Sequence, residues 1–175
     1  MKIKSSKILL LVTIALCIAN SVTAQSNPVV EATSAKILPI TPVNKVKDEK
    51  SFVKYADAAL AIMEKKANEL SIQGAAIVGF IPGELTSSWM TKMKVVNVLY
   101  TDKINYLAIA YTKASDMAVT LQNSGIDKTR KPLQGELGYQ GGLIKKIKNG
   151  YIIAVFSGGK TAQDLQVAQE GLNAL

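Results

Sequence analysis

The amino-acid sequence predicts an α+β domain in which helices flank an antiparallel sheet of about four or five strands. The chain has 175 residues, of which 48% are hydrophobic, and this is enough for the core of one compact domain. Apolar residues recur with helical spacing in three segments, and short apolar runs typical of strands lie between them. Tight turns join these runs in pairs, and strands joined in this way pair in antiparallel fashion.

Residues 1–24 have the pattern of an export signal. Three lysines precede an apolar stretch over residues 8–18, which is too short to span a bilayer, and small residues stand at the cleavage positions up to Ala24. A buried N-terminal helix is the alternative. Removal of the three lysines leaves 18 basic and 13 acidic residues, so the net charge falls from +8 to +5. We therefore expect a secreted or periplasmic protein without stable membrane insertion.

Residues 25–50 hold prolines among serine and threonine and are typical of a linker, so a single domain is expected over residues 51–175. Its first element is a helix with an apolar face. The residues of that face are Phe52, Ala56, Ala59, Leu60, Met63, Ala67 and Leu70. Residues 75–81 form a continuous apolar run before a Pro-Gly dipeptide, which predicts a buried strand and a tight turn. A second strand is expected within residues 85–95.

A second helix is predicted over residues 104–121, with Thr101 or Asp102 as its N-cap and Gly125 at its end. Residues 126–142 follow, and they are rich in glycine and charge. This segment has the length of a functional loop, and we expect it to connect the helix to a second pair of strands.

That second pair of strands is predicted over residues 143–148 and 151–156. The Asn-Gly dipeptide between them suits the two central positions of a type I′ hairpin turn. A last helix over residues 162–174 follows, and Thr161 with Asp164 three residues later forms a capping pattern. The cap and the helix dipole explain Asp164 without a further role.

Several chemistries are excluded. The sequence has no histidine, and its one cysteine, Cys17, lies within the export signal. Nucleophilic catalysis that depends on histidine and the usual zinc sites are therefore excluded. Lysine and arginine are scattered without interleaved aromatic residues, which argues against nucleic acid as a partner. Gly159-Lys160-Thr161 is similar to the end of a phosphate-binding P-loop, but Ala154 stands where the first glycine belongs. The turn can still hold one carboxylate or phosphate, or serve only to connect strand and helix.

A set of short motifs, many of them glycine-rich, lies between residues 113 and 172. Its members are Lys113-Ala114, Gly141-Gly142-Leu143, Ser157-Gly158-Gly159, Gln163-Asp164, Ala168 and Gly171-Leu172. Together they resemble the GlcG/HbpS family of small haem-binding and haem-degrading-like proteins, and the likeness extends over residues 51–175. The resemblance implies a profilin-like fold, frequent self-association and a small ligand, commonly haem.

The sequence departs from this family at two places. Gln140 stands where relatives usually have the first of three glycines, and Ile144 replaces a proline. Lys94 stands where relatives tend to have an aspartate, so a base replaces an acid. If that acid serves a ligand or a catalytic step in relatives, this chain has lost or altered the role.

Haem iron is held in proteins by His, Cys, Met or Tyr, and the mature chain offers only the last two. Tyr139 is the candidate iron ligand, Met93 is the candidate thioether ligand, and Lys113 is a candidate partner for a propionate. The alternatives are a loop tyrosine that packs on the sheet, a core methionine and a lysine that reaches toward the surface. The full set of candidate binding residues is Met93, Lys113, Tyr139, Gly141, Gly142, Ser157, Gly158, Gly159 and Lys160.

Three functions remain open. The leading one is an exported binding protein for haem or another small planar or acidic ligand, which we expect to form a homo-oligomer. The second is an oligomeric structural module without a ligand. The third is an enzyme acting on haem or a small organic acid, with Lys113, Asp164 or a tyrosine as acid or base, although the sequence does not identify catalytic residues.

Overall fold

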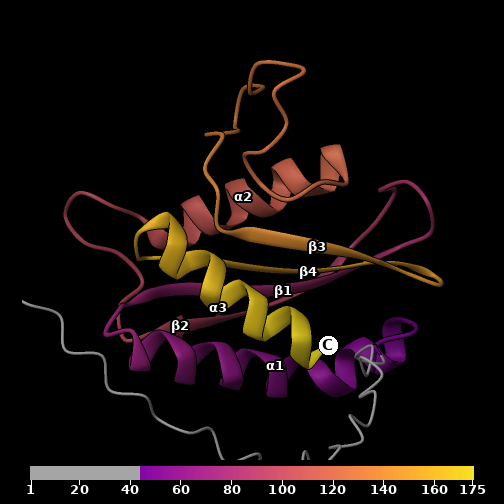
Figure 1. Ribbon diagram of the computed structural model, residues 1–175, viewed down its shortest axis with the longest axis horizontal. Helices are drawn as coiled ribbons and strands as arrows, with labels where there is room; N and C mark the ends of the chain where they lie inside the picture. The colour runs from indigo at the N-terminus through magenta and orange to yellow at the C-terminus, as the bar shows by residue number, and fades with distance from the viewer. Residues whose placement is uncertain (1–43) are drawn as a thin grey trace, which may run out of the picture. The chain divides into compact units, whose positions relative to one another are not determined.

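The computed structural model describes residues 44–175. The predicted export signal, and the predicted linker up to residue 43, lie outside the described residues. Within the described part the chain forms three helices and four strands (Figure 1). In chain order they are α1 (Glu49–Glu69), β1 (Gly74–Pro82), β2 (Met90–Val96), α2 (Tyr106–Thr120), β3 (Gly142–Ile147), β4 (Gly150–Ser157) and α3 (Thr161–Ala174).

The four strands form one antiparallel sheet in the order β2-β1-β4-β3. The central strands, β1 and β4, pair from Ala75 opposite Ser157 to Pro82 opposite Gly150. The helices α1 and α3 cover one face of the sheet and α2 covers the other (Figure 1). The predicted α+β class, with an antiparallel sheet and flanking helices, is therefore confirmed.

Side chains of β1 alternate between two apolar cores. Ala76, Val78 and Phe80 lie in the core with α1 and α3, whereas Ile77 and Ile81 lie in the core with α2. Because both faces of the strand are covered, the sequence shows a continuous apolar run here rather than an alternating one.

The start of α1 is fixed by a capping box. Asp48 Oδ1 accepts a hydrogen bond from Ser51 N at 2.8 Å, and Ser51 Oγ accepts one from Asp48 N at 3.0 Å. Just before this cap, Val46 N donates a hydrogen bond to Leu175 O at 2.6 Å, which joins the two ends of the described chain. No helix among residues 44–175 has both the length and the apolar character needed to cross a bilayer.

The second helix, α2, begins and ends at residues other than those predicted. Its N-cap is Asn105 rather than Thr101 or Asp102, because Asn105 Oδ1 accepts a backbone N–H of the first turn at 3.0 Å. Thr101 instead holds the turn that precedes the helix. The helix stops at Leu121, whose left-handed backbone (φ 53°) ends the hydrogen-bond ladder before Gly125 is reached.

The hairpin between β3 and β4 also differs from the prediction. Ile147 pairs with Gly150, so the turn residues are Lys148 and Asn149, and neither has a positive φ. The predicted type I′ turn is therefore wrong. Gly150 is required for another reason: its φ is +143°, and a Cβ there would collide with the carbonyl oxygen of Ile81.

The edge strand β2 is tied to α1 by ion pairs. Lys92 Nζ lies 2.8 Å from an oxygen of Asp57, and Lys94 Nζ lies 2.6 Å from an oxygen of Glu64. The base at position 94 thus faces a carboxylate of α1. The strand starts at Met90, later than the predicted window began, so residues 83–89 form a longer connection than a tight turn.

Candidate functional site

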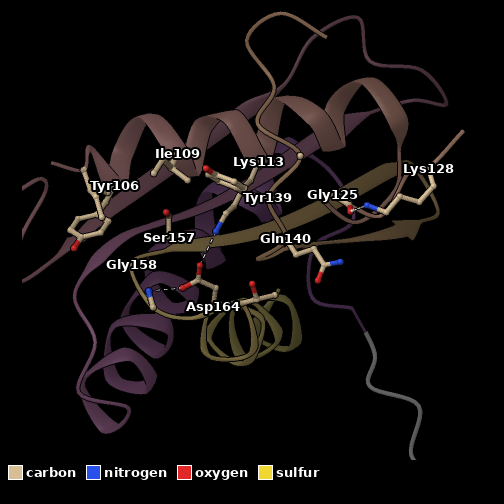
Figure 2. A pocket seen from close by; sticks show the side chains of 14 residues that line it. Tyr106, Ile109, Lys113, Gly125, Lys128, Tyr139, Gln140, Ser157, Gly158 and Asp164 are labelled. Carbon is tan, nitrogen blue, oxygen red and sulfur yellow. Dashed lines mark hydrogen bonds and ion pairs between the residues drawn. The ribbon is translucent and has the colours of Figure 1, made fainter. Parts of the chain in front are cut away.

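A cavity of about 490 Å³ lies where three segments far apart in the sequence meet (Figure 2). The first segment leads into α2 and forms its first two turns, the second is the loop between α2 and β3, and the third is the turn between β4 and α3. This volume is in the range of about 300–1,000 Å³ that small-molecule sites occupy. The cavity is therefore large enough for a small organic ligand.

One wall of the cavity is a buried ion pair that joins α2 to α3. Lys113 Nζ lies 2.8 Å from Asp164 Oδ2 (Figure 2). It also donates a hydrogen bond to Phe156 O at 2.8 Å. Asp164 Oδ1 accepts a hydrogen bond from Gly159 N at 2.8 Å. The side chains of Lys113 and Asp164 are only 3% and 5% exposed. Both charges are thus held by short, directed hydrogen bonds in a place that excludes bulk water.

Burial sets the acid–base behaviour of this pair. Desolvation lowers the pKa of Lys113, and the carboxylate of Asp164 opposes that change. Desolvation likewise raises the pKa of Asp164, while Lys113 and the backbone N–H groups of Gly159 and Gly158 oppose it. Burial thus favours the neutral form of each group, while the attraction between the two groups favours the charged forms.

Gly141 provides the space that the ion pair needs. Its φ is +129°, and a Cβ at this position would lie 2.5 Å from Lys113 Nζ and 2.9 Å from Asp164 Cβ. The backbone of Gly141 also accepts a hydrogen bond from Phe156 N at 3.0 Å. A side chain here would displace the lysine amine from its carboxylate.

The loop between α2 and β3 brings Tyr139 to the cavity. The side chain of Tyr139 is 53% exposed and lies over the wall that carries Lys113 (Figure 2). Gly125 packs directly beneath the backbone of Tyr139, because its φ of +67° and the lack of a Cβ allow close approach. The phenolic oxygen is therefore open to a ligand or to solvent.

Charged groups within the loop hold it in this shape. Arg130 forms a two-pronged ion pair with Glu136, with N–O distances of 2.7 and 3.0 Å, and lies 3.6 Å from Asp127 and 3.7 Å from Asp116 of α2. Asp116 also accepts a hydrogen bond from Gly125 N at 2.7 Å. One guanidinium group thus connects both halves of the loop to α2.

The structure brings together five of the nine candidate binding residues. Lys113, Tyr139, Ser157, Gly158 and Gly159 all line the cavity. The other four are placed elsewhere and are described next.

Gly141 lies behind the ion pair, and Gly142 begins β3, where a Cβ would collide with the sulfur of Met117. Met93 lies opposite Ile77 in the sheet and packs against the core under α2. It is therefore a core methionine, which was the alternative to a thioether ligand. Lys160 is the exposed N-cap of α3. Among the residues that the structure describes, neither Met93 nor Lys160 lines the cavity.

The predicted capping pair of Thr161 and Asp164 is wrong, although Asp164 does lie in the first turn of α3, as the helix-dipole interpretation requires. The N-cap of α3 is Lys160, Thr161 is the first helical residue, and Gln163 Oε1 accepts the hydrogen bond from Lys160 N at 3.0 Å. The carboxylate of Asp164 points inward to Lys113 instead. A capping pattern cannot reveal this partner, because it lies 51 positions away in the sequence.

Sequence reasoning missed several residues of the site. Ile104, Tyr106 and Ile109 form an apolar side of the cavity, and Lys128 adds a second amine, which donates a hydrogen bond to Gly125 O at 3.0 Å. Helical periodicity assigns the apolar residues to a helix but does not show that they face a cavity. Lys128 belongs to a short run of charged residues that reads as a solvated surface.

Among solved structures, the fold is similar to the crystal structure of Klebsiella pneumoniae protein ORFY, which carries the family description DUF336, a family that includes the GlcG-like group. The TM-score is 0.51 at 18% sequence identity, and the similarity covers 75% of this chain and 94% of that chain. No family model matches the sequence, and no curated protein matches it. At this identity the similarity supports the fold alone.

Proposed function

We propose that this chain is an exported protein of GlcG/HbpS type that binds a small acidic molecule with a flat apolar part. The observation that carries the proposal is the cavity itself, which has a buried Lys113–Asp164 pair on one wall and an apolar side next to it. Binding sites for small molecules combine apolar surface with a few fixed polar groups that orient the ligand, and both are present in this lining.

The charges in the cavity favour an acidic ligand. Its lining contains the two cations Lys113 and Lys128 and the single carboxylate of Asp164. Because Asp164 is paired with Lys113 at 2.8 Å, the amine of Lys128 is the charge left to attract an anion. Ile104 and Ile109 offer an apolar surface for the rest of the molecule.

Haem is the first member of this ligand class to test, because the resemblance points to it. The lining residues include neither methionine nor histidine nor cysteine but two tyrosines, Tyr106 and Tyr139. Tyr139 is the more exposed of the two, so its oxygen is the donor that would hold the iron, with Lys128 as a partner for a propionate. This donor set fits a weakly held ferric haem rather than a permanent cofactor. A bound haem would supply a redox-active iron.

A hemin titration tests the proposal. We expect a saturable change in the Soret band, with modest affinity and the spectrum of ferric haem bound through tyrosinate oxygen. Tyr139→Phe should change that spectrum and leave the fold intact, whereas Tyr55→Phe on α1, on the opposite face of the sheet, should not change it. Absence of a saturable Soret change in the unaltered protein would contradict haem binding.

Export is tested separately. Expression of the full sequence with its signal should give a protein that begins at Gln25 in the periplasm or medium. Mass mapping of the N-terminus checks this result. An intact Met1 on a cytosolic protein, or a lipid on Cys17, would contradict export by this signal.

A further inference from the structure

We propose that Lys113 is a nucleophile that forms an imine with the carbonyl group of a small keto acid bound in the cavity, and that Asp164 moves the protons of that reaction. The inference rests on the proposed function, because it names the chemical class of an acidic ligand for the same cavity. It adds a covalent step in which Lys113 does more than fix the ligand's position.

The first support is the position of the amine. Lys113 reaches the cavity wall from α2, and among the described residues its Nζ donates hydrogen bonds to two acceptors, Asp164 Oδ2 and Phe156 O. An ammonium group has three N–H donors. The third has no acceptor among the residues that the structure describes. A carbonyl group that accepts this hydrogen bond is placed next to the nitrogen that would attack it.

The second support is the acid at bonding distance. Amine nucleophiles are activated by desolvation in an apolar pocket, and they need a nearby group to take up and return protons. Asp164 lies 2.8 Å from the amine and is itself almost fully buried. Burial lowers the pKa of Lys113 and raises the pKa of Asp164, which brings the pKa values of the amine and the acid closer together.

Stability alone does not explain a buried pair at this place. Replacement of a buried ion pair by apolar residues of similar volume is often neutral or stabilising, so such a pair is weak evidence for a structural role. Titratable groups with shifted pKa values that face a cleft mark functional sites more often than others do. Here both conditions coincide with a cavity of about 490 Å³.

The proposed step balances. Asp164 takes a proton from the Lys113 ammonium, and the neutral nitrogen attacks the carbonyl carbon, forming a C–N bond while the C–O π bond breaks. Proton transfer from the new ammonium to the oxygen, through Asp164, gives a carbinolamine. Protonation of its hydroxyl releases water and leaves a C=N bond between Lys113 and the ligand. No oxidant or reductant is required.

Two features of the lining favour a keto acid over a simple aldehyde. Lys128, whose amine donates a hydrogen bond to Gly125 O, adds a positive charge to the same lining that attracts a carboxylate, and Ile104 and Ile109 can contact an apolar substituent. Phenylpyruvate combines these three parts and serves as the probe.

Borohydride trapping tests the inference. The protein is mixed with phenylpyruvate, treated with borohydride and digested for mass mapping. Hydride addition to the C=N bond fixes the ligand, so we expect Lys113 to gain the mass of phenylpyruvate less one oxygen atom and to do so faster than any other lysine. Lys160→Arg, at the exposed cap of α3, should leave this labelling unchanged.

The roles of the two residues are separated by variants. Lys113→Arg keeps the positive charge but cannot form the imine, so labelling at this position should disappear while circular dichroism remains unchanged. Asp164→Asn should slow the labelling about 100-fold, as expected for the loss of a general acid–base group. If Asp164→Asn does not fold, Asp164→Glu, which keeps the acid but moves it, should still slow the labelling.

A pH profile gives a readout that a structural ion pair would not produce. The titratable groups that share the cavity with Lys113 are Asp164, Lys128, Tyr106 and Tyr139. Only the neutral amine attacks, and the pKa of Lys113 is lowered, so its labelling rate should level off at a lower pH than that of exposed lysines such as Lys160. Equal profiles at the two positions would overturn the proposal.

A calorimetric titration distinguishes the two possible failures. If phenylpyruvate binds in the absence of borohydride but Lys113 is not labelled, the imine is refuted and the binding function stands. If neither phenylpyruvate nor hemin binds, the proposed function fails as well, and the inference fails with it.

Discussion

At the scale of single residues, two buried charges hold the centre of the cavity. Lys113 belongs to α2 and Asp164 to the first turn of α3, two helices that cover opposite faces of the sheet. The two side chains meet beside the end of β4. A buried charge is costly unless it is paired and hydrogen-bonded, and both conditions are met here. Each of the two residues can therefore stay charged in this buried position only while the other is present.

This dependence predicts a non-additive result for substitutions. Lys113→Met and Asp164→Leu should each lower the free energy of unfolding by about 3 kcal/mol or more, because each leaves one buried charge without its partner. In the double variant, the free energy of unfolding should fall by less than the sum of the decreases in the two single variants. It should not recover fully, because Phe156 O and Gly159 N also lose their partners. Urea unfolding of the four proteins measures this, and simple additivity would contradict the coupling.

A second prediction concerns the glycine beside the pair. Gly141→Ala places a Cβ 2.5 Å from Lys113 Nζ, so it should destabilise the protein and disturb the ion pair. Gly135→Ala is the matched control, because Gly135 also has a positive φ, +94°, but has open space around it. In the control, the free energy of unfolding should fall by only about 1 kcal/mol, the cost of placing an alanine at a positive φ. Equal thermal stabilities for the two variants would show that crowding at Gly141 has no effect.

At the scale of elements, the sequence predicts what local patterns determine. The apolar run of β1 is recognisable because two helix layers bury both faces of that strand. Caps and turns are predicted less well, because Asn105, Thr101 and Asp102 all have side chains that can cap a helix and the backbone path chooses among them. The turn of the β3–β4 hairpin lies one residue earlier than the sequence predicts, because Gly150 belongs to β4 and is needed for its close approach to Ile81.

The loop between α2 and β3 is the element whose shape depends most on one side chain. Arg130→Lys removes the two-pronged pair with Glu136 and leaves a single point charge. We expect faster amide hydrogen exchange over residues 126–138, with little change in the exchange of β1 and β4. Lys131→Arg, at the exposed neighbouring position, should leave the loop unchanged. A loop that exchanges as slowly in Arg130→Lys as in the unaltered protein would show that other contacts hold it.

At the scale of the whole molecule, the site is harder to predict than the fold. The fold follows from periodicity within segments, whereas the cavity is made by residues of three segments that only the completed sheet brings together. Tyr139 and the turn of Ser157, Gly158 and Gly159 could be found because glycine-rich loops show in the sequence. The partnership of Lys113 with Asp164 could not, because nothing local marks residues 51 positions apart as a pair.

Self-association is a prediction for the whole molecule. The edge strands β2 and β3 carry lysines, which discourage pairing of edges, so we expect contact through other surfaces. The expected species is a dimer or a larger homo-oligomer. Light scattering at micromolar concentration measures its mass, and the mass of one mature chain would contradict the prediction.

The central claim is that the cavity between α2, its following loop and the β4–α3 turn is the ligand site. Hydrogen–deuterium exchange with and without saturating hemin, followed by mass spectrometry, tests it most directly. The claim predicts protection confined to the loop that carries Lys128 and Tyr139 and to the turn from Ser157 to Thr161. Unchanged exchange at those segments, or protection centred instead on a second cavity of about 360 Å³ lined by Leu85, Thr86 and Trp89, would contradict it.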